Sequence, residues 1–335
     1  MYPRLKLARN LLTDDGVIFL SIDDNEVDNL KKLCNDIFGE ENFLGMFIVN
    51  SSPSGIDYGH LAKTNDYALF YCKNEREART NQLEESDKKF SYEDEQGGFN
   101  LYPLYNGNSA FNDKTRPNLV YPFYLNPENN YKDKFYEIGV DKKDGWIEIF
   151  PVVGKKDGIQ RVWRWGRPKA KENLNDEIIG IKNKNGEFRI VQKSRLTSKV
   201  IRSLQLDNEV SSRRGTLEIE SLLGKKVFSY PKPSKLIQRF CEVGSDEDSV
   251  IMDFFAGSSS TAHAVMQLNL EDNGNRKFIQ IQLPEPVEEN TEAHKSGYKT
   301  IAEIGKDRIR KVADKITQEH PEKAKDLDLG FKVFK

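Results

Sequence analysis

The chain has 335 residues, of which 37% are hydrophobic and 31% charged, and its formal net charge is −2. A mean hydropathy of −0.69 and the lack of any apolar run of about 18 residues exclude a membrane-spanning helix. No charged and apolar leader opens the sequence, and its three cysteines and four histidines lack the spacings of zinc sites. We therefore expect a cytoplasmic protein with reduced thiols and no metal, built as two domains or as one domain with a large insertion.

The first 75 residues alternate between helical and strand patterns. Apolar residues recur at helical spacing over residues 2–12, and the apolar run at 17–22 is typical of a strand buried on both faces. Asp23 and Glu26 form a D-x-x-E pair, which predicts a capped helix with an apolar inner face. Further strands are predicted at residues 43–49 and 67–71.

The last 110 residues repeat this alternation. Strands that alternate with helices indicate an α/β fold in which a parallel sheet is covered on both faces. The predicted helices span residues 234–243, 261–268 and 300–318, and the predicted strands span residues 249–255 and 278–283.

Between these ends, residues 76–225 lack the α/β alternation and are rich in Asn, Asp, Lys, Tyr and Gly. Short strand candidates are scattered through them, for example at residues 146–153 and 188–191. The strongly charged residues 74–98 predict a mobile surface segment. We interpret the middle of the chain as an inserted domain that is mostly β or mixed.

The string VIMDFFAGSSSTAHAVM at residues 250–266 predicts a strand, a glycine-containing turn and a helix. That arrangement opens a cavity above the helix N-terminus, and Gly257 lets a ligand approach the backbone closely. The next strand is followed by Glu285, which is placed to accept both hydroxyls of a ribose. Alone, the string fits a strand-to-helix turn of any doubly wound protein, but the two features together favour an adenosine-containing ligand.

Motifs of other nucleotide-binding and hydrolytic sites are missing. The sequence contains no G-x-G-x-x-G fingerprint and no G-K-[ST] of a phosphate-binding loop, and the segment after Gly257 does not form G-x-S-x-G. A nicotinamide dehydrogenase is a weak alternative, because a catalytic His or Tyr-Lys constellation is missing as well.

Asp-Phe-Phe-Ala-Gly-Ser at residues 253–258 resembles the F-x-G-x-G cofactor motif of β-group DNA amino-methyltransferases. Residues 274–285 look like the strand that follows this motif in the family, and residues 230–237 resemble the segment that walls its methionine pocket. Ser259 stands where many relatives have a second glycine, and a serine costs little there if its φ is negative. The resemblance implies S-adenosylmethionine as cofactor, bound by Asp253, Phe254, Phe255, Ala256, Gly257, Ser258, Thr261, Glu285 and Lys232.

The opening residues 1–26, together with residues 38–43, closely resemble the modification (Mod) subunits of type III restriction systems. Residues 64–74 look like the strand that closes the target half of the sheet in that family. In these relatives the opening block follows the catalytic D-P-P-Y, whose Asp binds the amino group of the flipped base and whose Tyr stacks on it. No D-P-P-Y, N-P-P-Y or S-P-P-Y occurs in the 335 residues. We therefore expect no catalytic residue in this chain, which is interpreted as truncated upstream, with a degenerate methyltransferase as the alternative.

The resemblance places a target-recognition region at residues 76–225, between a target half at 1–75 and a cofactor half at 226–335. Basic residues become more frequent toward the end of this region and alternate with Trp163 and Trp165. We expect the tryptophans to pack the core and the arginines to face DNA, although any single basic residue could equally lie on a solvated face. The candidates for DNA contacts are Arg161, Arg164, Arg167, Lys193, Arg195, Arg213 and Arg214. Residues 115–124 also resemble type III subunits; they could serve the flipped-base pocket or form a structural strand, and the structural role is the favoured interpretation.

The resemblance as a whole implies a Rossmann-like, site-specific DNA adenine-N6 methyltransferase that acts as the modification subunit of a type III system. Its partners would be double-stranded DNA, a second copy of the chain, and a restriction (Res) helicase-nuclease subunit. The chain alone is expected to be inactive. The alternative is a non-catalytic subunit that binds DNA and serves as a scaffold for a restriction partner.

Overall fold

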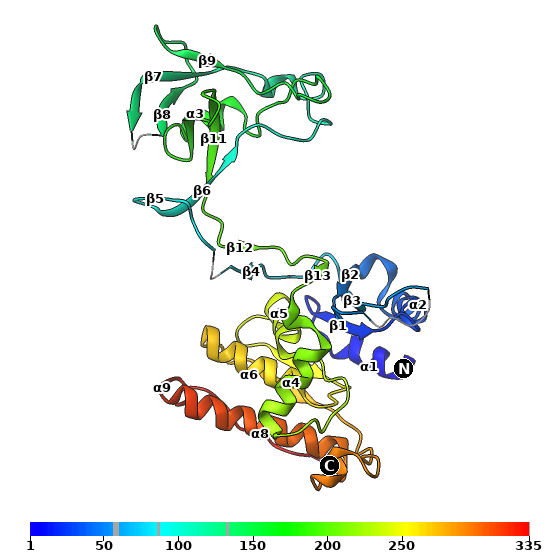
Figure 1. The fold of residues 1–335 in the computed structure, drawn as a ribbon. Helices are drawn as coiled ribbons and strands as arrows, with labels where there is room; N and C mark the ends of the chain where they lie inside the picture. Colours follow the sequence, from blue (N-terminus) through cyan, green and yellow to red (C-terminus); the bar gives the residue numbers. More distant parts are fainter. Residues whose placement is uncertain (56–59, 86–87, 132–133, 335) are drawn as a thin grey trace. The chain divides into compact units, whose positions relative to one another are not determined.

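The computed structural model describes four stretches of the chain, residues 1–55, 60–85, 88–131 and 134–334. These stretches form two compact units (Figure 1). The first unit comprises residues 1–84 and 198–335, and the second unit comprises residues 85–197. The second unit covers fewer residues than the predicted insertion at 76–225, because residues 198–225 contribute two strands and a helix to the first unit. None of the described helices is long and apolar enough to cross a membrane.

The larger sheet of the first unit has the strand order β1-β3-β2-β13. Helix α2 returns the chain so that β1 and β2 run in the same direction, but β3 follows β2 without a described helix and lies antiparallel between them. The prediction of one parallel sheet is therefore wrong. The strands and the first two helices are α1 (Tyr2–Leu11), β1 (Val17–Ile22), α2 (Val27–Phe38), β2 (Phe43–Val49), β3 (Asp66–Cys72) and β13 (Leu204–Gln205).

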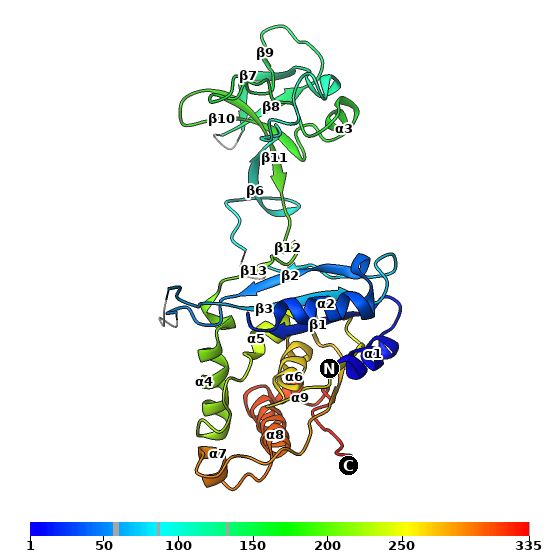
Figure 2. The ribbon, with the colours of Figure 1, turned by 90° about the vertical axis from the view of Figure 1, so that its right-hand side faces the viewer.

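Strand β3 is buried from both sides by helices (Figure 2). Because successive side chains of a strand point to opposite faces, Leu69 and Tyr71 pack in the cluster that contains α1 and α2 residues. Ala68 and Phe70 pack on the other face, in the cluster that contains Phe240 of α5 (Ser234–Gly244). The predicted helix and strand positions in residues 1–75 are confirmed.

The predicted capping pair of α2 is wrong. The helix begins at Val27 with Glu26 as its N-cap, and no side chain caps it. The Asp23 carboxylate instead accepts the backbone N–H of Asn25 at 3.1 Å, which stabilises the turn before the helix.

The last 110 residues contain a short parallel pair, β14 (Val250–Asp253) and β15 (Lys277–Gln280), with α6 (Ser260–Asp272) between them in sequence. Helix α6 packs against α5 through Val265 and Leu268, and against α8 (Ile301–Glu319) through Ala262 and Met266. Both strands end earlier than predicted, and Val250 is 61% exposed, so the predicted burial of the first strand is wrong at its start. The remaining elements of this unit are β4 (Leu83–Glu84), β12 (Ser198–Lys199), α4 (Ser212–Leu223), α7 (Glu292–Lys295) and α9 (Pro321–Ala324), with 3-10 turns at Glu40–Asn42 and Asn208–Val210.

The second unit is a seven-stranded antiparallel sheet in the order β5-β6-β11-β10-β8-β7-β9, so the prediction of a mostly β or mixed region is confirmed. Ile178 and Ile179 of β10 enter hydrophobic clusters on opposite faces of the sheet. The elements are β5 (Tyr92–Asp94), β6 (Gly97–Pro103), a 3-10 turn (Pro117–Leu119), β7 (Phe123–Tyr131), β8 (Phe135–Gly139), β9 (Ile147–Ile149), α3 (Arg167–Glu172), β10 (Ile178–Lys182) and β11 (Phe188–Ser194).

The tryptophans lie as predicted. Trp163 is 2% exposed in the larger cluster, and its Nε1–H donates to the Tyr121 carbonyl at 2.7 Å, while Trp165 packs partly buried against that cluster. Tyr121 and Phe123 belong to the same cluster, in agreement with a structural role for residues 115–124. Of the predicted mobile segment, parts form β4 and β5, and residues 86–87 lie outside the described residues.

Candidate functional site

The turn at the carboxyl end of β14 is tied to the first turn of α6 by one side chain. The Asp253 carboxylate accepts the backbone N–H of Phe255 at 3.0 Å through Oδ1 and the Thr261 hydroxyl at 2.6 Å through Oδ2. Ala256 donates its N–H to the carbonyl of Ile281, just after β15. Asp253 and Thr261, both predicted to contact a cofactor, therefore also hold each other and shape the turn.

Two residues of this turn are left-handed, Gly257 with φ +50° and Ser259 with φ +60°. The expectation that serine costs little at position 259 depended on a negative φ and is wrong. A side chain in this conformation is strained by about 1 kcal/mol, since its Cβ lies close to the following carbonyl oxygen. The N–H of Ser259 donates to the Ala256 carbonyl at 2.6 Å, and the N–H of Gly257 donates to the Gln282 side chain at 2.8 Å. Tight hydrogen bonding thus maintains the strained turn.

Two of the predicted cofactor residues are open to solvent at this turn. Phe255 is 49% exposed, and Glu285 is exposed after the end of β15. The Arg4 guanidinium lies 5.2 Å from the centroid of the Phe255 ring, a contact that no local sequence pattern indicated. An exposed ring can stack on a base and a carboxylate can accept two ribose hydroxyls, so these residues suit a nucleoside. Ala256 and Ser258 are buried, and Phe254 packs against the cluster of α1 and α2.

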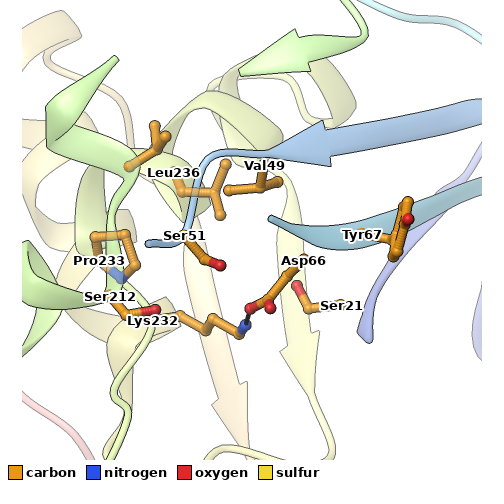
Figure 3. A pocket seen from close by; sticks show the side chains of 10 residues that line it. Ser21, Val49, Ser51, Asp66, Tyr67, Ser212, Lys232, Pro233 and Leu236 are labelled. Carbon is orange, nitrogen blue, oxygen red and sulfur yellow. Dashed lines mark hydrogen bonds and ion pairs between the residues drawn. The ribbon is translucent and has the colours of Figure 1, made fainter. Parts of the chain in front are cut away.

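A small cavity with both polar and apolar lining residues lies beside the segment before α5 (Figure 3). Figure 3 shows Lys232 and Asp66 pointing toward each other, and Lys232 Nζ donates to Asp66 Oδ2 at 2.8 Å. The Lys232 carbonyl accepts the Ser260 hydroxyl at 2.7 Å, which connects this segment to the start of α6. Sequence reasoning selected Lys232 but missed Asp66, because the two residues are 166 positions apart. The lining residues are Ser21, Val49, Ser51, Asp66, Tyr67, Val210, Ser212, Lys232, Pro233 and Leu236.

A fully buried arginine lies under the turn. Arg308 of α8 is 0% exposed, and its Nη1 donates to Ser258 Oγ at 3.0 Å and to Ser260 Oγ at 2.7 Å. Its Nη2 lies 3.0 Å from Glu218 Oε2 and 3.0 Å from His263 Nδ1. Since a guanidinium only donates, Nδ1 of the imidazole accepts and its proton lies on Nε2. Burial and the neighbouring Arg308 charge hold the pKa of His263 well below its usual range, so the ring is neutral.

Most of the DNA-contact candidates in the second unit are paired within the protein. Lys193 and Arg195 both donate to Asp94, at 2.6 and 2.7 Å, and they hold the pKa of that carboxyl well below its usual range. Arg161 donates to Asp157 at 2.6 Å, and this side chain is 11% exposed. These contacts fix the basic side chains in the structure of the unit.

Other candidates are more open. Arg167 donates to the Val140 carbonyl at 2.7 Å but stays exposed, and Arg164 is exposed while its Nε lies 3.3 Å from the Tyr105 carbonyl. Arg213 and Arg214 are exposed on the first turn of α4, in the first unit rather than in the second. The DNA contacts of all these residues stay predictions.

The sequence profile of a family described as DNA methylase matches residues 1–289. The EcoPI Mod subunit, a type III restriction-modification enzyme of Escherichia phage P1, is 36% identical across 100% of this chain, which covers 52% of that protein. The StyLTI Mod subunit of Salmonella typhimurium is 33% identical across 100% of the chain, which covers 47% of that protein. The type II methyltransferase M.KpnI of Klebsiella pneumoniae is 33% identical, with 94% of this chain and 73% of that protein covered. The chain thus spans about half the length of the Mod subunits that it matches.

Proposed function

Because the chain belongs to the DNA methylase family, we propose that it is part of a site-specific DNA adenine-N6 methyltransferase, the modification subunit of a type III restriction system. The proposed arrangement is a Rossmann-like catalytic domain with the second unit as its target-recognition insertion. The proposed cofactor is S-adenosylmethionine, which supplies a methyl group on a sulfonium.

The turn between β14 and α6 is the observation that supports this proposal most strongly. It combines the 49% exposed Phe255 ring, the left-handed Gly257 without a side chain, and the exposed Glu285 carboxylate after the neighbouring strand. In the proposal Phe255 stacks on the adenine, Glu285 accepts the ribose hydroxyls, and Gly257 leaves room for the ligand beside the backbone.

The D-P-P-Y motif, which positions the target base in the related enzymes, does not occur in this sequence. Within the described residues, β14 pairs only with β15 and β1 pairs only with β3, so each strand has an edge without a partner. These edges support the proposal that a further strand, carrying the base-binding tetrapeptide, completes the site. Since catalysis of this transfer is mostly positioning, the chain alone should bind its ligands without methylating DNA.

Cofactor binding is tested by calorimetric titration of the chain with S-adenosylhomocysteine. Phe255→Ala and Glu285→Gln are each expected to raise the Kd about tenfold, because each removes one recognition contact. Tyr102→Ala is the matched control, since this 46% exposed aromatic residue lies in the second unit. Unchanged affinity in the first two variants would place the ligand elsewhere.

Methyl transfer is tested on the chain alone and on the chain extended upstream by a segment that contains D-P-P-Y. The extended protein should transfer the methyl of S-adenosylmethionine to DNA adenine, and the chain alone should not. Failure of the extended protein would contradict the proposal that only the base-binding segment is missing.

A second candidate, a non-catalytic DNA-binding and scaffolding subunit, is favoured by the missing tetrapeptide alone. It would bind double-stranded DNA and a restriction subunit without any effect of S-adenosylhomocysteine. The proposed partners are the same in both cases, namely DNA, a second copy of the chain and a Res subunit. Copurification of the Res subunit and the mass of the assembly in solution test the protein partners.

A further inference from the structure

The turn that follows β14 requires support from outside itself. Gly257 and Ser259 are both left-handed, and a strained serine persists only where its surroundings fix it. Arg308 provides two such contacts, because its Nη1 donates to the hydroxyls of Ser258 and Ser260, at 3.0 and 2.7 Å. The two serines flank Ser259, so one guanidinium holds the turn on both sides of its strained residue.

The guanidinium itself is held from three helices. Its Nη2 contacts Glu218 of α4 and His263 of α6, each at 3.0 Å. The Glu218 carboxylate is fixed in turn by the backbone N–H of Ser234, at 2.9 Å from Oε2, at the start of α5. Burial lowers the pKa of Arg308 only to about 10, so the group stays charged near neutral pH. Four of its five N–H groups thereby have an acceptor, and Nε has no partner among the residues that the structure describes.

Helix α8 also approaches the turn closely at Gly305, three residues before Arg308. A Cβ at Gly305 would lie 2.6 Å from Ser259 Oγ and 3.2 Å from the Gly257 carbonyl oxygen. Gly305 and Arg308 are three positions apart and therefore share one face of the helix. The same face thus lets the turn approach and holds it by hydrogen bonds.

We propose that Arg308 is a positioning residue, which holds residues 257–260 in the shape that binds the cofactor, with Glu218 orienting its guanidinium. This inference rests on the proposed function, in which the turn contacts S-adenosylmethionine. Arg308 is 0% exposed and acts through the turn rather than by touching the ligand. A buried ion pair often contributes little to stability compared with apolar side chains of similar size, so placement of the turn explains this one better.

A second buried arginine provides a matched control. Arg276 is 7% exposed and donates to Ser245 Oγ at 3.1 Å and to Asp272 Oδ2 at 2.7 Å. It precedes β15, at the opposite end of the strand from the turn. Arg276→Met therefore removes a comparable buried guanidinium from the same unit without altering the contacts of residues 257–260.

The experiment compares Arg308→Met, Arg308→Lys and Arg276→Met in the whole chain. Calorimetry with S-adenosylhomocysteine should show a Kd raised about tenfold or more in Arg308→Met, partly restored in Arg308→Lys, and within about twofold of the original in Arg276→Met. The midpoint temperature of thermal unfolding should fall in both methionine variants. Without ligand, amide hydrogen exchange of residues 256–261 should accelerate in Arg308→Met and stay unchanged in Arg276→Met.

Equal changes of affinity and exchange in the two methionine variants would overturn the inference, as would unchanged exchange in Arg308→Met. If the unsubstituted chain does not bind S-adenosylhomocysteine, the proposed cofactor fails, but the exchange comparison still decides whether Arg308 holds the turn. If Arg308→Met does not fold, Ser258→Ala removes one of the two contacts and is read in the same way.

Discussion

At the scale of single residues, Ser259 shows how the structure accommodates a serine where many relatives have the second glycine of the F-x-G-x-G motif. Its φ of +60° places a β-carbon where glycine would be unstrained. We predict that Ser259→Gly is more stable than Ser259→Ala by about 1 kcal/mol, because both variants lose the hydroxyl and only alanine keeps the left-handed strain. Urea unfolding of the two variants measures this difference. Equal stabilities would mean that the turn relaxes to a negative φ.

We predict that His263 makes the stability of the protein depend on pH. Its pKa is lowered in the folded state by burial and by the charges of Arg308 and Lys315, so the unfolded chain takes up a proton first as the pH falls below about 6.5. Its contribution to stability is therefore complete above that pH and is lost on acidification, by at most about 1.4 kcal/mol per pH unit. Burial raises the pKa of Glu218, so this group changes stability with pH in the opposite direction.

The pH effect is tested with His263→Asn, whose side-chain oxygen can accept the hydrogen bond of Arg308. The free energy of unfolding should fall less steeply between pH 6.5 and pH 5 in this variant than in the unsubstituted protein, by roughly 1 kcal/mol over the interval. Parallel curves for the two proteins would show that another group is responsible.

The residues of the candidate site could be predicted from sequence only where their pattern is local. Gly257 and Glu285 follow strands along the chain, so their place beyond strand ends was predictable, whereas Asp253 was predicted within a strand at residues 249–255 and is the last residue of β14. The partners of Lys232 and Ser258 were not, because Asp66 and Arg308 are 166 and 50 positions away. The pairing of such residues depends on packing between elements, which a single sequence does not display.

Helix α4 provides the sharpest test of DNA contacts at the scale of elements. Arg213 and Arg214 are exposed on its first turn, whereas Lys193 and Arg195 share Asp94 in the second unit. We predict that Arg213→Ala with Arg214→Ala lowers DNA affinity roughly three- to tenfold, and makes the slope of log K against log salt shallower by about 1.8, the value for two lost phosphate contacts.

The control for this measurement is Arg310→Ala with Lys311→Ala, which removes an exposed basic pair of equal charge from α8. Fluorescence anisotropy with duplex DNA at several salt concentrations supplies both numbers. The same loss of affinity in the two double variants would indicate a general effect of net charge rather than contacts at α4.

At the scale of the whole molecule, periodicity predicted the helices and strands of the first unit well but predicted the wrong sheet. Apolar runs such as residues 17–22 and 43–49 mark strands, yet they do not specify which neighbour each strand pairs with. Strand β3 lies antiparallel between two strands that a helix connects, and only the three-dimensional packing of Leu69 and Phe70 on opposite faces explains its position. The second unit was predictable as a β-rich region, but its ends were not, since β12, β13 and α4 join the first unit through contacts with residues far away in the sequence.

The two units should fold independently. Residues 85–197 have their own clusters on both faces of one sheet, so this fragment alone is expected to unfold cooperatively. In the other unit, Glu84 pairs with Ser198 in antiparallel register, so an Asn-Gly turn can join them in place of the second unit. The shortened chain should unfold cooperatively and bind S-adenosylhomocysteine within about twofold of the original affinity. Loss of the folded state in either piece, measured by circular dichroism on heating, would contradict this division.

The chain enters and leaves the second unit at adjacent points, with the Glu85 N–H donating to the Thr197 carbonyl at 2.6 Å. Closing a longer loop at fixed ends adds only about 0.6 kcal/mol for each doubling of its length. Evolution can therefore replace the second unit by a segment of different size between Glu84 and Ser198 while the first unit keeps its thermodynamic stability. Under the proposed function, in which the second unit is the target-recognition insertion, a lineage that swaps this unit by recombination would acquire a new specificity in one step, without first passing through a misfolded intermediate protein.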